Sequence, residues 1–191
     1  MDVALDAYAT ALSLTRRKPL LPLRVEHAAV LRPDQLQRIA QLGVVPTTQS
    51  VFFDNMGDGI IGALTPERLQ FTYRGKSLLD AGIILPGSSD APCASESALL
   101  GIEKFVTRTT GEGQLFGPRK ECLSVREALE CYTTGSAAAT GFASTKGRLA
   151  RGYLADFVAL GVNLLDAEPE TISQTPVRAT VLGGKFTYQN L

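Results

Sequence analysis

The sequence has no tryptophan, a single histidine and only three cysteines in 191 residues. The cysteines, at positions 93, 122 and 131, are odd in number and form no C-x-x-C pair. This argues against a disulfide framework or a structural zinc site, and it predicts a reducing cytoplasmic setting. A self-contained zinc site usually takes at least three protein ligands, and one histidine with thiols that lack ligand spacing does not supply them.

The chain also lacks an excess of charge of either sign, with 19 basic and 19 acidic residues. Without a basic stripe or an acidic tail, neither nucleic acid nor an anionic membrane is expected as a partner. No apolar run reaches the roughly 18 residues that a membrane span needs. The first residues have no basic segment followed by a long apolar stretch, so no secretory signal is expected. The composition, 45% apolar, suits one sizeable core.

Hydrophobic periodicity predicts helices that alternate with short apolar strands, which is typical of βαβ units and a parallel sheet. We expect helices at residues 2–14, 33–42, 77–81, 95–108 and 124–132, and strands at 20–25, 44–53 and 83–85. Residues 54–64 and 109–121 are rich in glycine and are predicted to be loops. Thr134-Gly135 is expected to end the helix before it.

The character of the sequence changes from about residue 142 onward, where glycines separate short apolar runs. Residues 157–160 are predicted to be β structure, and residues 177–182 and 185–188 a hairpin that turns at Gly183-Gly184. The sequence therefore predicts an α/β portion at residues 1–141 and a small β-rich portion at residues 142–191.

Two polar segments follow apolar runs and offer the groups that a zinc hydrolase needs. Arg24-Val25-Glu26-His27-Ala28 supplies an imidazole, and Gly87-Ser88-Ser89-Asp90-Ala91-Pro92 supplies a carboxylate. Such a pair can hold a metal ion and move a proton. Other interpretations stay open, because a lone histidine is often a polar residue satisfied by its neighbours, and Ser-Asp-Ala-Pro also suits an Asx turn.

Other candidate sites carry weaker signals. Cys93 lies near Asp90, but no histidine is free to activate its thiol if His27 holds a metal. Ser88-Ser89 has no Gly-x-Ser-x-Gly elbow, and Gly111-Glu112-Gly113 lacks the lysine of a phosphate loop. Glu26 points away from His27 if both lie on a strand, so it is interpreted as structural.

In its ordered motifs the chain resembles the amidohydrolase superfamily, in the branch called amidohydrolase family 3, which includes N-acyl-D-amino-acid deacylases. The resemblance covers nearly the whole chain, and no single motif in it is specific. The matching segments are Leu5-Asp6-Ala7-Tyr8, Arg24 to Ala28, Leu42-Gly43-Val44, Ser50-Val51-Phe52, Tyr73-Arg74, Asp80-Ala81-Gly82, Ser89-Asp90-Ala91-Pro92, Arg108-Thr109-Thr110, Glu127-Ala128-Leu129, Tyr132-Thr133, Gly147-Arg148-Leu149, Gly152 to Phe157, Thr180-Val181 and Gly183-Gly184-Lys185.

The resemblance implies a role for each matching residue. His27 corresponds to the metal-binding histidine that ends barrel strand six, and Asp90 to the aspartate that ends strand eight, contacts metal and handles the proton. Arg74 matches an arginine that would bind a substrate carboxylate or another anion, and Asp156 matches a structural aspartate. In the intact family one or two Zn²⁺ ions activate a water for attack on the carbon–nitrogen bond of a small amide-type substrate.

The chain departs from the family pattern because the earlier ligands, a His-x-His pair and a strand-five histidine, have no counterpart in it. The expected fold is therefore a partial (β/α)8 barrel of strands six to eight with a small C-terminal β-sandwich portion, and we expect it to be inactive alone. Two alternatives remain, a subunit completed by a separate N-terminal chain or a homo-oligomer, and a non-catalytic binding module. Amide, lactam, formyl and carbamate substrates all stay open.

Overall fold

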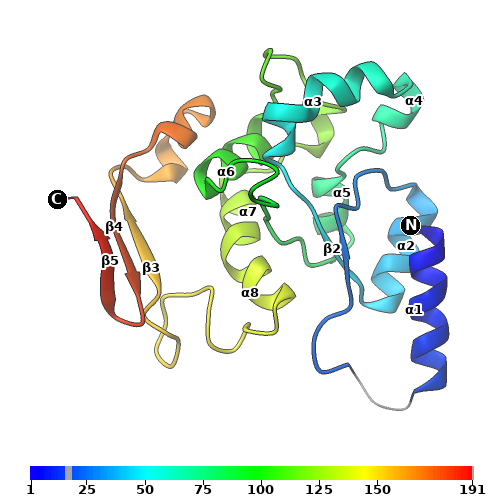
Figure 1. Ribbon diagram of the computed structural model, residues 1–191, viewed down its shortest axis with the longest axis horizontal. Helices are drawn as coiled ribbons and strands as arrows, with labels where there is room; N and C mark the ends of the chain where they lie inside the picture. The colour runs from blue at the N-terminus through cyan, green and yellow to red at the C-terminus, as the bar shows by residue number, and fades with distance from the viewer. Residues whose placement is uncertain (16–18, 191) are drawn as a thin grey trace.

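The computed structural model describes residues 1–15 and 19–190 and has a mixed α/β fold with two small, separate sheets (Figure 1). In the first sheet, β1 (Arg24–Glu26) pairs in parallel with β2 (Val45–Thr47), with Glu26 opposite Thr47. Directly after β2, Thr48 forms a parallel bridge with Gly87. Three segments of the chain, far apart in sequence, therefore run side by side and end near one another.

The second sheet is antiparallel and lies at the end of the molecule that carries the C-terminus (Figure 1). Its strands are β3 (Phe157–Leu160), β4 (Val177–Leu182) and β5 (Lys185–Gln189), with β4 in the middle. The hairpin predicted at Gly183-Gly184 is confirmed. Both glycines have positive φ, 57° and 79°, as the two central residues of a type I′ hairpin turn require.

The remaining elements are helical. They are α1 (Asp2–Leu14), α2 (Pro33–Leu42), α3 (Phe52–Ala63), α4 (Pro66–Leu69), α5 (Gly75–Asp80), α6 (Ala98–Thr107), η1 (Arg119–Glu121), α7 (Val125–Glu130), the π-helix η2 (Cys131–Gly135), α8 (Ser136–Ala139), η3 (Leu164–Asp166) and η4 (Pro169–Gln174). No helix in the described part of the chain is both long and apolar enough to cross a membrane.

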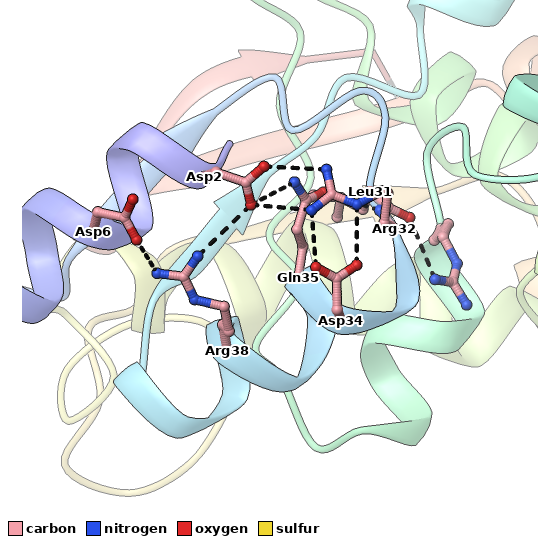
Figure 2. Close-up of polar contacts among 8 residues, drawn as sticks. Asp2, Asp6, Leu31, Arg32, Asp34, Gln35 and Arg38 are labelled. Atoms are coloured by element: carbon pink, nitrogen blue, oxygen red, sulfur yellow. Dashed lines mark hydrogen bonds and ion pairs between the residues drawn. The ribbon is translucent and has the colours of Figure 1, made fainter.

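The predictions for α1 and α2 are confirmed at both ends. The α2 helix stops at Gly43, whose φ of 64° is the left-handed cap that glycine adopts without strain. Leu5 on α1 is fully buried and belongs to the main core. Figure 2 shows how the polar faces of the two helices meet: Arg32 and Gln35 contact Asp2, and Arg38 contacts Asp6. These ion pairs are half-exposed, so burial of Leu5 contributes more to docking than they do.

Two hydrophobic cores hold the fold together. A smaller, largely aromatic core contains Val51, Phe52, Phe53, Tyr73 and Phe116. The main core lies between the helices and the first sheet and consists of Leu5, Ala28, Leu31, Leu36, Ile39, Val44, Leu78, Ile83, Leu85, Ile102, Phe105, Leu123, Ala128, Cys131, Leu164 and Ile172. Because Leu164 and Ile172 belong to it, the segment before β4 is packed into the same core as the α/β portion. The boundary predicted between residues 141 and 142 stays a prediction.

The prediction of a strand at residues 44–53 followed by a loop at 54–64 is wrong. The strand is only Val45–Thr47, and α3 begins at Phe52 and runs through the glycine-rich stretch. A side chain at Gly57 would come within 2.7 Å of the Thr110 methyl group, so this glycine allows close packing and does not break the helix. Burial of Phe52 and Phe53 outweighs the poor helix propensity of glycine.

The predicted helix end at Thr134-Gly135 is also wrong. The helical path continues from α7 through the π-helix η2 directly into α8. A Cβ atom at Gly135 would lie 2.5 Å from the carbonyl oxygen of Leu85, so the glycine lets the helix approach the 83–87 segment closely. The wide π turn is a form of helix often found where a helix meets a functional site.

Of two further strand predictions, one is right only in part and one is wrong. The run from Leu20 to Val25 forms a strand only from Arg24, and Leu20 and Leu21 are exposed. Residues 83–85 do not form a strand, although Ile83 and Leu85 are buried and Gly87 forms a parallel bridge with Thr48. The sheet edge next to β1 has no partner strand among the described residues.

Candidate functional site

His27 lies directly after β1 and has an unusual backbone conformation. Its φ is 67°, and the Ala28 amide donates a hydrogen bond to the Glu26 carbonyl across it at 2.9 Å, which makes a γ-turn. Positive φ is uncommon outside glycine, and this γ-turn is of the strained kind. The imidazole is exposed and stacks on Phe52, with ring centroids 6.0 Å apart.

Asp90 follows the 83–87 segment and is strained in the same way. Its φ is 57°, and its carbonyl oxygen accepts a hydrogen bond from the Cys93 amide at 2.8 Å. Its carboxylate, partly buried, makes no hydrogen bond or ion pair with any described residue. The turn is thus closed by the backbone, and the Asx-turn interpretation of the Asp90 side chain is wrong. The carboxylate is left with both oxygens open.

Gln49 connects the two strand ends and was missed by the sequence analysis. Its side-chain oxygen lies 3.2 Å from Nδ1 of His27, and its amide nitrogen donates to the Ser88 hydroxyl at 3.5 Å. Gln49 is 2% exposed, and Ser88 stands two residues before Asp90. The available signal was the polar run that starts at Thr47 at the end of an apolar strand, which we interpreted as more strand.

A second set of contacts fixes the loop that carries Asp90. Tyr132 from η2 donates to the Ser88 carbonyl at 3.4 Å and lies 3.3 Å from the hydroxyl of Ser50. The Ser50 hydroxyl in turn donates to the Gly101 carbonyl at 2.7 Å. The tyrosine ring fits a slot between Gly87 and Gly101, where a Cβ atom on either glycine would overlap it. These contacts join the ends of β2, the 83–87 segment and α6.

Burial raises the pKa of Tyr132 to about 12, because the ionised phenolate is poorly solvated there. The folded pKa lies above the unfolded value of about 10, so the stabilisation is complete below pH 10 and is lost as the pH rises through 12. We expect the free energy of unfolding, followed by urea denaturation across this range, to fall by on the order of 2 kcal/mol. Tyr132→Phe should make this fall with pH smaller, whereas Tyr188→Phe, at an exposed position, should leave it unchanged. If the free energy of unfolding falls equally with pH in wild type and both variants, Tyr132 is not the cause of the fall.

Arg74 is already engaged by neighbouring groups. Its guanidinium donates to the Leu31 carbonyl and the Ser77 hydroxyl, and its Nε lies 3.6 Å from the carboxylate of Glu121. Glu121 is buried and also accepts from the Ser77 amide at 2.9 Å, which caps α5. These contacts describe a structural ion pair, and binding of a substrate anion by Arg74 stays a prediction.

Two other sequence candidates, Glu26 and Asp156, are engaged by other partners. Glu26 is paired with Arg24 at 2.6 Å. Asp156 accepts from the Gly183 amide and pairs with Lys146, which agrees with a structural role. The three cysteines are free thiols. Within residues 1–15 and 19–190 no three His, Cys, Asp or Glu side chains come together as a metal-binding group.

Comparison with known proteins adds the family context. The sequence model of the amidohydrolase family matches residues 1–188. The putative amidohydrolase YtcJ of Bacillus subtilis (strain 168) is 32% identical over 169 residues, which cover 87% of this chain and 32% of that protein. An N-substituted formamide deformylase of Arthrobacter pascens is 28% identical over 191 residues, covering 99% of this chain and 34% of the relative.

A solved structure has a similar fold. The crystal structure of an uncharacterized metal-dependent hydrolase from Pyrococcus horikoshii OT3 aligns with a TM-score of 0.75 and 30% identity, covering 88% of this chain and 33% of that one. The chain spans about a third of the length of the curated relatives it matches. Because the family model matches residues 1–188 of the 191 in this chain, the chain belongs to the amidohydrolase family.

Proposed function

We propose that this chain contributes His27 and Asp90 to the active site of a metal-dependent hydrolase that cleaves non-peptide carbon–nitrogen bonds in small molecules. The observation that carries the proposal is the link from His27 through Gln49 to Ser88, which joins the residue after β1 to the loop that carries Asp90. Enzymes of the barrel type place their chemistry at the carboxyl ends of parallel strands.

The backbone supports the same assignment. His27 and Asp90 are both non-glycine residues in the left-handed region of φ. Strain of this kind costs on the order of 1–3 kcal/mol per residue and is concentrated at functional sites. Positive φ also occurs at Ala28, Tyr73 and Arg108, so the strain at His27 and Asp90 agrees with a functional role without singling out these two residues.

Asp90 is the group that we assign to proton transfer. Its carboxylate has no partner among the described residues, so it is free to accept a proton from an attacking water and to deliver it to the leaving nitrogen. The same oxygens suit contact with a cation, as the imidazole of His27 does. One carboxylate would thus serve first as base and then as acid.

The donor set falls short of a complete metal site. Imidazole and carboxylate are fitting ligands for Zn²⁺, but two donors are fewer than the three that a catalytic zinc site uses. We propose that β1, β2 and the 83–87 segment correspond to strands six to eight of a (β/α)8 barrel; the family match and the fold shared with a metal-dependent hydrolase support this. The remaining ligands would come from strands that lie outside the described residues.

Two features favour completion by another polypeptide segment or chain. The outer edge of β1 has no partner among the described residues. Leu20 and Leu21, which precede β1, are exposed and line a pocket of about 350 Å³ with Leu12 and Leu42. The 191-residue chain alone is accordingly expected to be inactive.

Formyl amides are the first substrates to test, because the Arthrobacter relative is an N-substituted formamide deformylase. The protein would be tagged at its carboxyl terminus in the cells that produce it, so that whatever completes the site is retained on purification. We expect this material to contain zinc and to hydrolyse an N-substituted formamide or another small amide. Asp90→Asn should lower turnover by about 10²–10⁴-fold and keep much of the zinc.

The control is Glu96→Gln, which neutralises an exposed carboxylate a few residues further along the same loop. It should leave turnover unchanged. Activity of Asp90→Asn within tenfold of the unmodified protein would contradict the role of Asp90. Material without zinc and without activity on any small amide would favour the alternative, a non-catalytic binding module that keeps the fold.

A further inference from the structure

We propose that Gln49 is a positioning residue that sets the tautomer of His27 and ties its ring to the loop of Asp90. The proposal gives His27 the ligand role assigned above, and to that extent it rests on the proposed function. Its physical content concerns only residues of this chain, namely which ring nitrogen carries the proton and which side chain holds it there.

The contact at Nδ1 defines the tautomer. The Gln49 atom that lies 3.2 Å from Nδ1 is the amide oxygen, which accepts hydrogen bonds and donates none. With the Gln49 amide in this orientation, the contact is a hydrogen bond when Nδ1 carries the hydrogen, and in a neutral imidazole Nε2 then keeps its lone pair. Neutral histidine in water prefers the opposite form, with the hydrogen on Nε2, so the environment has to impose this tautomer.

Gln49 itself is held so that its oxygen faces the ring. Its amide nitrogen donates to the Ser88 hydroxyl, and the Ser88 carbonyl accepts from Tyr132. At 2% exposure the Gln49 side chain has little freedom to turn away. The imidazole also stacks on the ring of Phe52, which restricts its rotation. One buried amide thus orients His27 and couples it to the segment that ends in Asp90.

The chemical consequence is a histidine prepared to act as a ligand. Nε2 of His27, which carries the lone pair, would be the atom that holds a divalent cation, and the hydrogen bond from Nδ1 to Gln49 would fix the ring and raise its basicity. Removal of such a supporting partner in metal sites typically costs 10–100-fold in metal affinity. Gln49 makes no bond to the reacting groups in this account and acts only through His27 and Ser88.

The test uses the fact that His27 is the only histidine in the chain. Uniformly ¹⁵N-labelled protein with no histidine tag gives one imidazole pattern in a long-range ¹⁵N–¹H correlation spectrum, recorded at a pH where that ring is neutral. We expect the form protonated at Nδ1 to dominate by about tenfold, the scale of one hydrogen bond. In Gln49→Leu, which removes the acceptor, the form protonated at Nε2 should become the major one.

The matched variant is Gln49→Glu, which keeps an acceptor of the same length and should keep the Nδ1 proton. The backbone amide spectrum, recorded on the same samples, separates loss of the contact from loss of the fold. A wild-type ring protonated mainly at Nε2, or an unchanged tautomer in folded Gln49→Leu, would overturn the proposal. If Gln49→Leu does not fold, the wild type and Gln49→Glu still decide it. Because no activity is measured, failure here is distinct from failure of the proposed hydrolase.

Discussion

Replacing Arg108 with methionine is expected to lower the free energy of unfolding by about 3–5 kcal/mol, a large share of the stability of a domain this size. Arg108 is 1% exposed, and its guanidinium donates to three backbone carbonyls. Nε reaches Phe116 at 2.8 Å, Nη1 reaches Tyr73 at 2.9 Å and Nη2 reaches Thr72 at 3.2 Å. Methionine would leave the buried carbonyls of Phe116 and Thr72 without a donor, and each such loss costs about 1–3 kcal/mol. The Tyr73 carbonyl would keep the hydrogen bond that it accepts from the Gly75 amide at 2.8 Å.

The aromatic core adds to the expected effect. The guanidinium carbon lies 4.9 Å from the ring centroid of Phe53 and 5.6 Å from that of Phe116, so the charge is in contact with two aromatic faces. No described carboxylate forms an ion pair with Arg108. Burial lowers the pKa of Arg108 to about 10, which still leaves the side chain charged at neutral pH. Arg108 therefore stabilises the place where these chain segments meet through hydrogen bonds from its guanidinium to their backbone carbonyls.

Equilibrium unfolding in guanidinium chloride measures the effect as a shift in midpoint at unchanged slope. Arg126→Met is the matched control, since Arg126 is exposed on α7 and its replacement should change stability by less than about 0.5 kcal/mol. Arg108→Lys should fall between wild type and Arg108→Met, because one ammonium group cannot reproduce a planar fork of donors. A loss below about 1 kcal/mol in Arg108→Met would show that the carbonyls find other donors.

The elements that the sequence predicts best are those whose signals are local. The α2 helix begins at Pro33 and ends at Gly43, and the capping box of Ser124 and Glu127 opens α7 as expected. The Gly183-Gly184 turn is equally local, because both residues need positive φ. In each case the decisive interaction lies within four residues along the chain, so pattern and structure agree.

The errors occur where glycine serves packing between distant segments. Gly57 makes room for Thr110, and Gly135 makes room for the Leu85 carbonyl. From sequence alone these glycines are indistinguishable from helix breakers, since their partners lie about fifty residues away. The candidate site shows the same difference between local signals and contacts of distant segments. His27 and Asp90 could be named from sequence and resemblance, whereas Gln49 could be found only once the ends of β1 and β2 were placed side by side.

The largest effect of a single added methyl group is expected at Gly101. In Gly101→Ala the new Cβ atom would overlap the hydroxyl of Tyr132, whose ring also packs closely against Gly87. Either the ring leaves its slot or α6 moves, and both lose buried contacts. We expect the free energy of unfolding to fall by about 3 kcal/mol, although alanine has the higher helix propensity.

The same substitution at Gly59 provides the control with the opposite sign. Gly59 lies exposed within α3, and a Cβ atom there would meet no atom within 4 Å. Gly59→Ala is therefore expected to raise stability by about 0.5–1 kcal/mol. If urea denaturation shows that both variants change the free energy of unfolding in the same direction, a clash with Tyr132 is not the cause of the effect of Gly101→Ala.

A double-mutant cycle separates the clash from any other effect of alanine at position 101. In a Tyr132→Ala background the slot is empty, so Gly101→Ala should cost little further stability or gain some from helix propensity. The coupling free energy between the two positions should then reach about 2 kcal/mol, within the range for residues in direct contact. Additive effects would mean that Tyr132 does not occupy the slot between Gly87 and Gly101, and that the loop of Asp90 is held in place by other contacts.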